Sequence, residues 1–176
     1  MGQYYTAIFL KTREENKQDE IIKAYHPHDF DMGAKLMETS WIGNQFDAFV
    51  EHELFNNPKR VVWAGDYADE EPDGENLHTK ANDFRETEGI NKTYHFTEGF
   101  YVVNHDKKQF YKRPEENDEW VVNPLPLLTC EGNGRGGDYF SEKNIDMVGT
   151  WARDTIELTT KHPTKDYTEI FPEFED

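Results

Sequence analysis

The apolar residues of this chain fall into short runs rich in β-branched and aromatic side chains, and polar, turn-forming segments separate these runs. Three of the runs are Tyr4–Leu10, Ile21–Tyr25 and Val61–Ala64. Runs of this length and composition are typical of strands. Two further runs, Phe100–Asn104 and Gln109–Lys112, flank a short polar segment and predict a hairpin. The chain is therefore expected to build mainly a sheet.

One stretch has a helical period instead. Between about residues 33 and 56 the large apolar side chains recur at the spacing of one helix face. Gly43-Asn44 is expected to divide this stretch into two helices, and Pro58 is expected to end the second.

The remaining chain is expected to be extended or looped. Leu125–Leu128 is predicted to be a short extended piece, Val148–Thr160 the longest strand, and Tyr167–Phe171 the last strand. Strands outnumber helices, and short turns connect most of them. The sequence predicts a single α+β domain over residues 1–176, in which the helical segment at about 33–56 packs on an antiparallel sheet.

Charge limits the partners of this chain. It has 36 Asp and Glu against 19 Lys and Arg, a formal net charge of −17 at pH 7. Such a surface repels nucleic acid and anionic lipid, so direct binding to either is not expected, whereas docking on a basic protein is. The densest acidic run is the predicted partner-binding surface, formed by Asp69, Glu70, Glu71, Asp73 and Glu75. Hydrophobic residues are only 35%, but aromatic residues reach 14% and carry enough apolar area for a core.

The location expected from the sequence is the cytoplasm. No apolar run approaches the roughly 18 residues that span a membrane, and the N-terminal residues lack the pattern of a signal peptide. The single cysteine, Cys130, cannot form an internal disulfide and fits a reducing compartment.

A structural zinc ion is predicted from the histidines. His26 and His28 are two residues apart, so in an extended segment both rings would face the same side. A tetrahedral zinc site needs two further ligands, and the thiolate of Cys130, the His105 ring and the Asp66 carboxylate are the candidates. Zinc would tie segments about a hundred residues apart and add its binding free energy to folding.

The sequence contains no motif that specifies a catalytic reaction. Gly132, Gly134 and Gly137 match the spacing of a dinucleotide-binding loop, but no convincing helix follows them, as that site requires. A tight surface loop is the preferred interpretation. No catalytic residue is assigned, and a metal-dependent hydrolase is kept as the alternative function.

Four segments together resemble a family of small, largely uncharacterised proteins of phages, prophages and their bacterial hosts. These segments are His26–Phe30 with Lys35–Glu38, Val61–Asp69 (VVWAGDYAD), Pro124–Tyr139 with its phrase EGNGRGGDY, and Gly149–Asp154 (GTWARD). The small acidic make-up is also similar to that of type II anti-CRISPR proteins, which inhibit Cas9 by binding it directly. The resemblance implies a cytoplasmic protein of the host cell that binds Cas9, whose nucleic-acid channel is strongly positive, and blocks DNA loading or cleavage.

Overall fold

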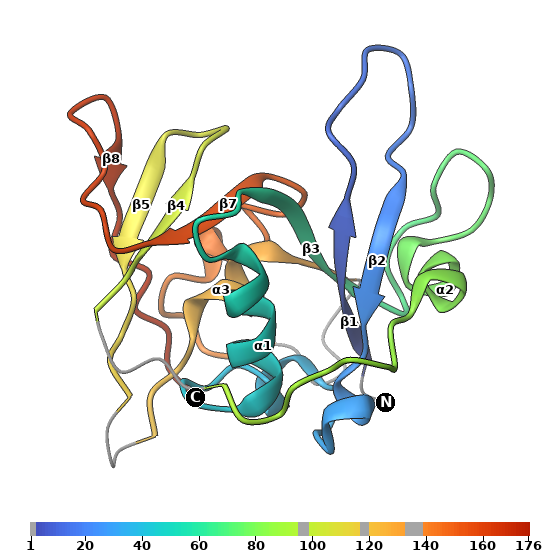
Figure 1. Cartoon of the computed structure of the whole chain (residues 1–176), viewed down its shortest axis with the longest axis horizontal. Helices are drawn as coiled ribbons and strands as arrows, with labels where there is room; N and C mark the ends of the chain where they lie inside the picture. The colour runs from blue at the N-terminus through green and yellow to red at the C-terminus, as the bar shows by residue number, and fades with distance from the viewer. Residues whose placement is uncertain (1–2, 95–98, 117–119, 133–138) are drawn as a thin grey trace.

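The strands of both halves of the chain join one sheet (Figure 1). The computed structural model describes residues 3–94, 99–116, 120–132 and 139–176. Its strands are β1 (Tyr5–Leu10), β2 (Ile21–Tyr25), β3 (Lys59–Gly65), β4 (Tyr101–Asn104), β5 (Gln109–Lys112), β6 (Cys130–Glu131), β7 (Thr155–Thr159) and β8 (Thr168–Glu169). Their order is β2-β1-β3-β7-β4-β5-β8, and β6 pairs with β3. The β3–β6 and β5–β8 pairs are parallel and the other pairs antiparallel. The predicted α+β class is confirmed.

Short helices and 3₁₀ turns cover the sheet. They are η1 (Pro27–Phe30), η2 (Leu36–Glu38), α1 (Gln45–Leu54), α2 (Leu77–Lys80), η3 (Ala81–Phe84), α3 (Pro124–Thr129) and η4 (Ile145–Met147). Within the described part of the chain, none of the helices has the length and apolar character needed to cross a membrane.

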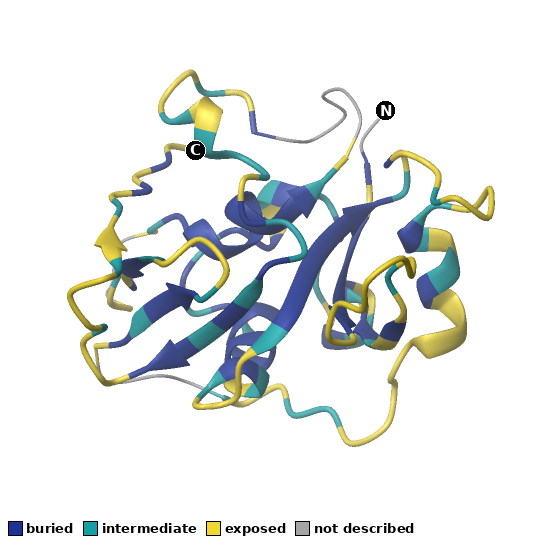
Figure 2. Ribbon diagram, turned by 90° about the horizontal axis from the view of Figure 1, so that it is seen from above, coloured by how far each residue is buried: buried dark blue, intermediate teal, exposed yellow. Residues whose placement is uncertain are grey.

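The central strands β1 and β3 are buried on both faces, as Figure 2 shows. In β1, Ala7 and Phe9 belong to the main core, which includes α1 and α3. Ile8 and Leu10 point to the opposite face, where a second cluster includes Leu77 of α2. Because side chains alternate along a strand, cover on both faces explains why β1 is apolar at every position except Thr6, rather than alternating.

The helical segment predicted at about 33–56 is only partly helical. Its α-helix is α1 alone, and the residues before it form the single turn η2. The Ser40 hydroxyl donates to the Leu36 carbonyl at 2.7 Å, and the Asn44 amide donates to the Trp41 carbonyl at 2.6 Å. Side-chain bonds of this kind compete with helical bonds. Gly43, at φ +93°, completes the break that was predicted there.

The prediction of extended chain at Leu125–Leu128 is wrong, because these residues lie in α3. Asn123 caps the helix by accepting the Leu125 N–H at 3.2 Å. Pro124 occupies the first turn, where a missing N–H costs no helical bond. The prolines that suggested an interrupted strand therefore begin a helix.

The long strand predicted at Val148–Thr160 is also wrong in its first half. Only β7 is a strand, and the residues before it turn. Gly149 and Arg153 have φ angles of +78° and +68°, which are incompatible with a continuous strand. This turn brings Arg153 to the site described next.

Candidate functional site

A cavity of about 800 Å³ lies where the loop after β3, strand β6 and the segment 139–153 meet. Its polar wall carries four carboxylates, those of Asp69, Glu71, Glu131 and Glu142, together with the guanidinium of Arg153. Its apolar wall includes Phe140, Ile145 and Val148. We call it the acidic cavity, since its described lining residues carry a formal charge of −3.

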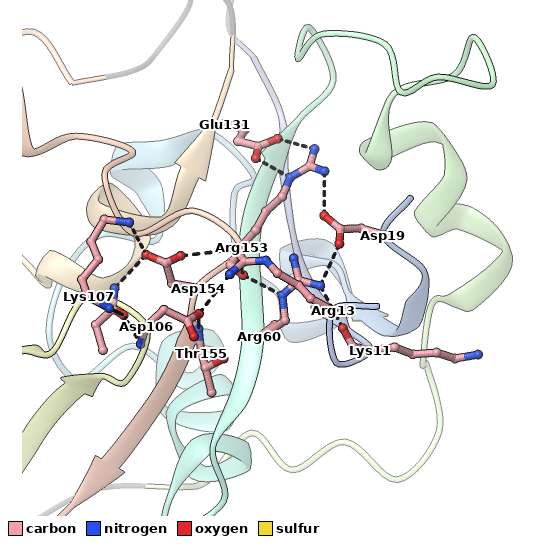
Figure 3. Close-up of polar contacts among 11 residues, drawn as sticks. Lys11, Arg13, Asp19, Arg60, Asp106, Lys107, Glu131, Arg153, Asp154 and Thr155 are labelled. Atoms are coloured by element: carbon pink, nitrogen blue, oxygen red, sulfur yellow. Dashed lines mark hydrogen bonds and ion pairs between the residues drawn. The ribbon is translucent and has the colours of Figure 1, made fainter. Parts of the chain in front are cut away.

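Arg153 is the centre of the polar wall. Its guanidinium donates to both oxygens of Glu131 at 2.6 and 2.9 Å and pairs with Asp19 at 3.1 Å and Glu71 at 2.6 Å. Figure 3 shows it held between Glu131 and Asp19. Burial by itself would lower the pKa of Arg153, but the hydrogen bonds to Glu131 and Glu71 outweigh burial and raise it. This cation is therefore a fixed part of the wall.

The backbone of Arg153 is fixed as firmly as its side chain. Its N–H donates to the Val61 carbonyl of β3 at 3.0 Å, and its carbonyl accepts the Arg60 Nε–H at 2.9 Å (Figure 3). Arg60 also pairs with Asp19 at 2.8 Å. Burial would raise the pKa of Asp19, but its bonds to Arg60 and Arg153 lower it. The ionised form of Asp19 is thus the form that the folded chain favours.

Two glycines let the cavity wall come close to the sheet. A Cβ atom on Gly132 would lie 2.4 Å from the Tyr5 hydroxyl. A Cβ atom on Gly149 would lie 2.9 Å from the Cys130 carbonyl, and the φ of Gly149 is positive. The glycines of this region therefore serve close packing.

The predicted acidic run does not form one uniform surface. Asp69 lines the acidic cavity, and Glu71 turns inward to Arg153. Asp73 pairs with Lys80 at 2.5 Å, whereas Glu70 and Glu75 are exposed. Only part of the run thus borders the cavity.

The predicted zinc ligands lie in different surroundings. His26 and His28 are in contact, with ring centroids 4.6 Å apart, and the third ring near them is that of His78, 6.2 Å from His26. Burial, and then the charge of Arg85, lower the pKa of His26 to about 4. Cys130 donates its thiol to the Leu127 carbonyl at 3.3 Å.

The other two predicted ligands have partners of their own. Asp66 accepts the Tyr4 N–H at 3.0 Å. Both ring nitrogens of His105 are engaged, one by Tyr167 and one by Glu157. Among the described residues, no three His, Cys, Asp or Glu side chains form a group that could hold a metal ion. The zinc ion stays a prediction, and no observation assigns its ligands.

All four segments on which the resemblance rests contribute to the lining of the acidic cavity. Leu36 belongs to the first, Asp69 ends the second, Glu131, Gly132 and Tyr139 belong to the third, and Gly149 and Arg153 to the fourth. Sequence reasoning missed Arg153 as a site residue. The clue was an arginine next to Trp151 and Ala152 in a chain with excess acid.

The Gly134–Asp138 part of the glycine-rich loop lies outside the described residues. Comparisons with protein-family models, with curated proteins and with solved structures found no match to this chain.

Proposed function

We propose that this protein is a binding protein that takes a basic segment of a partner protein into the acidic cavity. The observation that carries this proposal is the composition of the cavity wall, where carboxylates and exposed apolar side chains lie together. Lys and Arg side chains combine an apolar stem with a cationic end, so they match such a wall.

The carboxylates of the cavity differ in their availability. Glu71 and Glu131 already hold Arg153. Within the described part of the chain, Asp69 and Glu142 have no ion pair. These two carboxylates are the ones left to receive an incoming cation, and Arg153 is an internal example of a guanidinium bound by this wall.

The apolar wall supplies the second component of an interface. Phe140 is 59% exposed and Ile145 is 46% exposed. Aromatic and aliphatic anchors at the centre of an interface contribute most of its affinity, while surrounding charges set orientation and association rate. We therefore place Phe140 and Ile145 among the contact residues.

Cas9 is the candidate partner, because the resemblance implies it and its nucleic-acid channel is basic. The test measures binding of the full chain to Cas9 at low salt by biolayer interferometry, together with Cas9 cleavage of DNA. The double variant Asp69→Asn/Glu142→Gln is expected to weaken binding about tenfold or more, as the loss of two desolvated charge contacts would.

The matched control is Glu70→Gln/Glu75→Gln, which removes the same charge from exposed positions of the acidic run. It is expected to change affinity less than about threefold, since rim charges contribute little. Absence of binding at low salt would rule out Cas9. Equal losses in the two double variants would rule out the acidic cavity as the contact site.

A further inference from the structure

A second cavity, of about 610 Å³, lies beside the β4–β5 hairpin and does not depend on the acidic cavity. Three of its lining residues form a hydrogen-bonded chain. His105 Nε2 lies 2.8 Å from Glu157 Oε1, and His105 Nδ1 lies 2.8 Å from the Tyr167 hydroxyl. We call this chain the Tyr–His–Glu relay.

The backbone holds each member of the relay in place. The His105 N–H donates to the Thr155 carbonyl at 2.9 Å. Glu157 lies in β7, opposite Val103 of β4. Tyr167 directly precedes β8, whose Thr168 N–H donates to the Lys108 carbonyl at 2.9 Å. The side chains of His105 and Glu157 are 32% and 19% exposed, so the relay is partly shielded and still open to the cavity.

With Glu157 as an acceptor, one arrangement of protons on the neutral imidazole satisfies both hydrogen bonds of the relay. An ionised Glu157 only accepts, so His105 Nε2 carries the imidazole proton. Nδ1 is then an acceptor, and the Tyr167 hydroxyl donates to it. The lone pairs of the phenol oxygen remain available. A nucleophile whose base is oriented by a third group is the arrangement of a covalent catalyst.

We propose that the Tyr–His–Glu relay makes Tyr167 a nucleophile toward a small carboxylic ester bound in this cavity. The apolar wall formed by Val103 and Pro163 suits a neutral ester, and Thr160 and Lys161 provide donors for its oxygen. Tyr167 oxygen attacks the carbonyl carbon, the phenol proton passes to His105 Nδ1, and the ester C–O bond breaks. The alcohol leaves with that bond's electron pair and takes a proton from the imidazolium.

The second half of the reaction returns the relay to its starting state. Water attacks the acyl-tyrosine, its proton passes to His105, and the bond between the acyl carbon and Tyr167 oxygen breaks. Tyr167 then recovers its proton from His105, and the carboxylic acid is released. Glu157 stabilises the imidazolium in both halves and acts as a positioning residue.

The test compares tyrosines within one protein. An arylsulfonyl fluoride reacts with an activated phenol by forming an O–S bond and releasing fluoride, so the labelled residue can be identified by mass spectrometry. Tyr4 and Tyr67 are the internal controls, since they are 45% and 44% exposed and neither hydroxyl is bonded to a histidine among the described residues. Tyr167 is expected to react at least about a hundredfold faster than either, the low end of a general-base effect.

Variants separate activation from structure. His105→Gln and Glu157→Gln are expected to slow labelling of Tyr167, and added imidazole is expected to restore it in His105→Ala. The matched control His52→Gln removes an exposed histidine that does not line this cavity, and it is expected to leave the rate unchanged. Circular dichroism checks that each variant is folded.

A second arm tests the ester. Incubation with p-nitrophenyl acetate is expected to place an acetyl group on Tyr167 and to release p-nitrophenol in a burst that Tyr167→Phe abolishes. Labelling of Tyr167 no faster than Tyr4 and Tyr67 would overturn the relay. Sulfonyl labelling without any acetyl group on Tyr167 would overturn the assignment of a carboxylic ester.

Discussion

Asp47 is the residue whose surroundings depart furthest from those of an ordinary surface acid. Its side chain is fully buried in α1, and its Oδ2 accepts the Asn123 amide at 2.9 Å. Its Oδ1 has no hydrogen-bond partner within the described part of the chain. Burial, and then the charge of Glu51, raise the pKa of Asp47 well above 3.8. Glu51, the other buried acid of α1, differs from Asp47 because its carboxylate forms an ion pair with the buried Arg113.

The raised pKa predicts the effect of Asp47→Asn. The stability contributed by protonated Asp47 is fully present below pH 3.8, its ordinary pKa, and is lost as pH rises through the folded-state pKa. The variant cannot ionise, so it should gain stability relative to the natural chain as pH rises from about 4 to 8. Urea unfolding of both proteins across that pH range measures this difference in the free energy of unfolding.

Asp29→Asn is the control with the opposite sign. The hydrogen bonds from Arg85, at 2.6 and 2.7 Å, lower the pKa of Asp29. Its contribution is therefore present above the ordinary pKa of 3.8 and is lost as pH falls through the lowered value. At pH 7, Asp29→Asn should therefore be less stable than the natural chain. If Asp47→Asn were the more damaging of the two at pH 7, the interpretation of Asp47 would be wrong.

At the scale of elements, caps decide where the helices begin. Asn44 accepts the Asp47 N–H at 2.7 Å to cap α1 and also donates to the carbonyls of Thr39 and Trp41. Asn76 caps α2 by accepting the Thr79 N–H at 2.9 Å. Its amide donates to the carbonyls of Asp66 at 2.9 Å and Ala68 at 3.4 Å, but Asn76 is only half-buried. Asn44 is completely buried, so its loss also leaves two carbonyls without donors.

Asn44→Ala is expected to lower the free energy of unfolding by about 2–4 kcal/mol, since a lost cap costs about 1 kcal/mol and unpaired buried groups add to that. Asn44→Asp should recover the cap but not the two donated bonds, and should fall between Ala and Asn. Asn76→Ala is the comparison, and it is expected to lower the free energy of unfolding by about 1 kcal/mol. Chemical denaturation measures all three. An equal cost for Asn44→Ala and Asn76→Ala would show that the burial of the donated bonds does not matter.

At the scale of the whole molecule, the net charge of −17 opposes folding. Repulsion among like charges destabilises a folded state, and salt screens it. Raising NaCl from about 20 to 200 mM should raise the melting temperature by about 2–4 °C, which corresponds to roughly 1 kcal/mol at this chain length. Scanning calorimetry measures it, with KCl at equal ionic strength to exclude an ion-specific effect.

A charge variant checks the cause of that shift. Glu70→Lys/Glu75→Lys changes two exposed positions, and because each replacement adds two charges it brings the formal net charge from −17 to −13. Its melting temperature should rise less with salt than that of the natural chain. A melting temperature that falls with salt would mean that the ion pairs outweigh the repulsion.

The sequence by itself determined the features that depend on near neighbours. The runs at β1, β2 and β3 were predicted from composition, the β4–β5 hairpin from its turn, and the break at Gly43-Asn44 from backbone preference. Each of these follows from residues a few positions apart, because strand and turn preferences are local. Local preference was also misleading twice, at α3 and before β7, where a helix cap and two positive φ angles overrode it.

The tertiary structure alone decided which distant side chains meet. Arg153 binds Asp19, and His105 binds Tyr167, across separations of 134 and 62 residues. No periodicity or spacing in the sequence encodes such pairs, since they depend on the order of strands in the sheet. The same reason explains why His26 and His28 lie near His78 rather than in a group with Cys130 and His105. Topology sets long-range contacts, so both candidate sites became visible only in the folded chain.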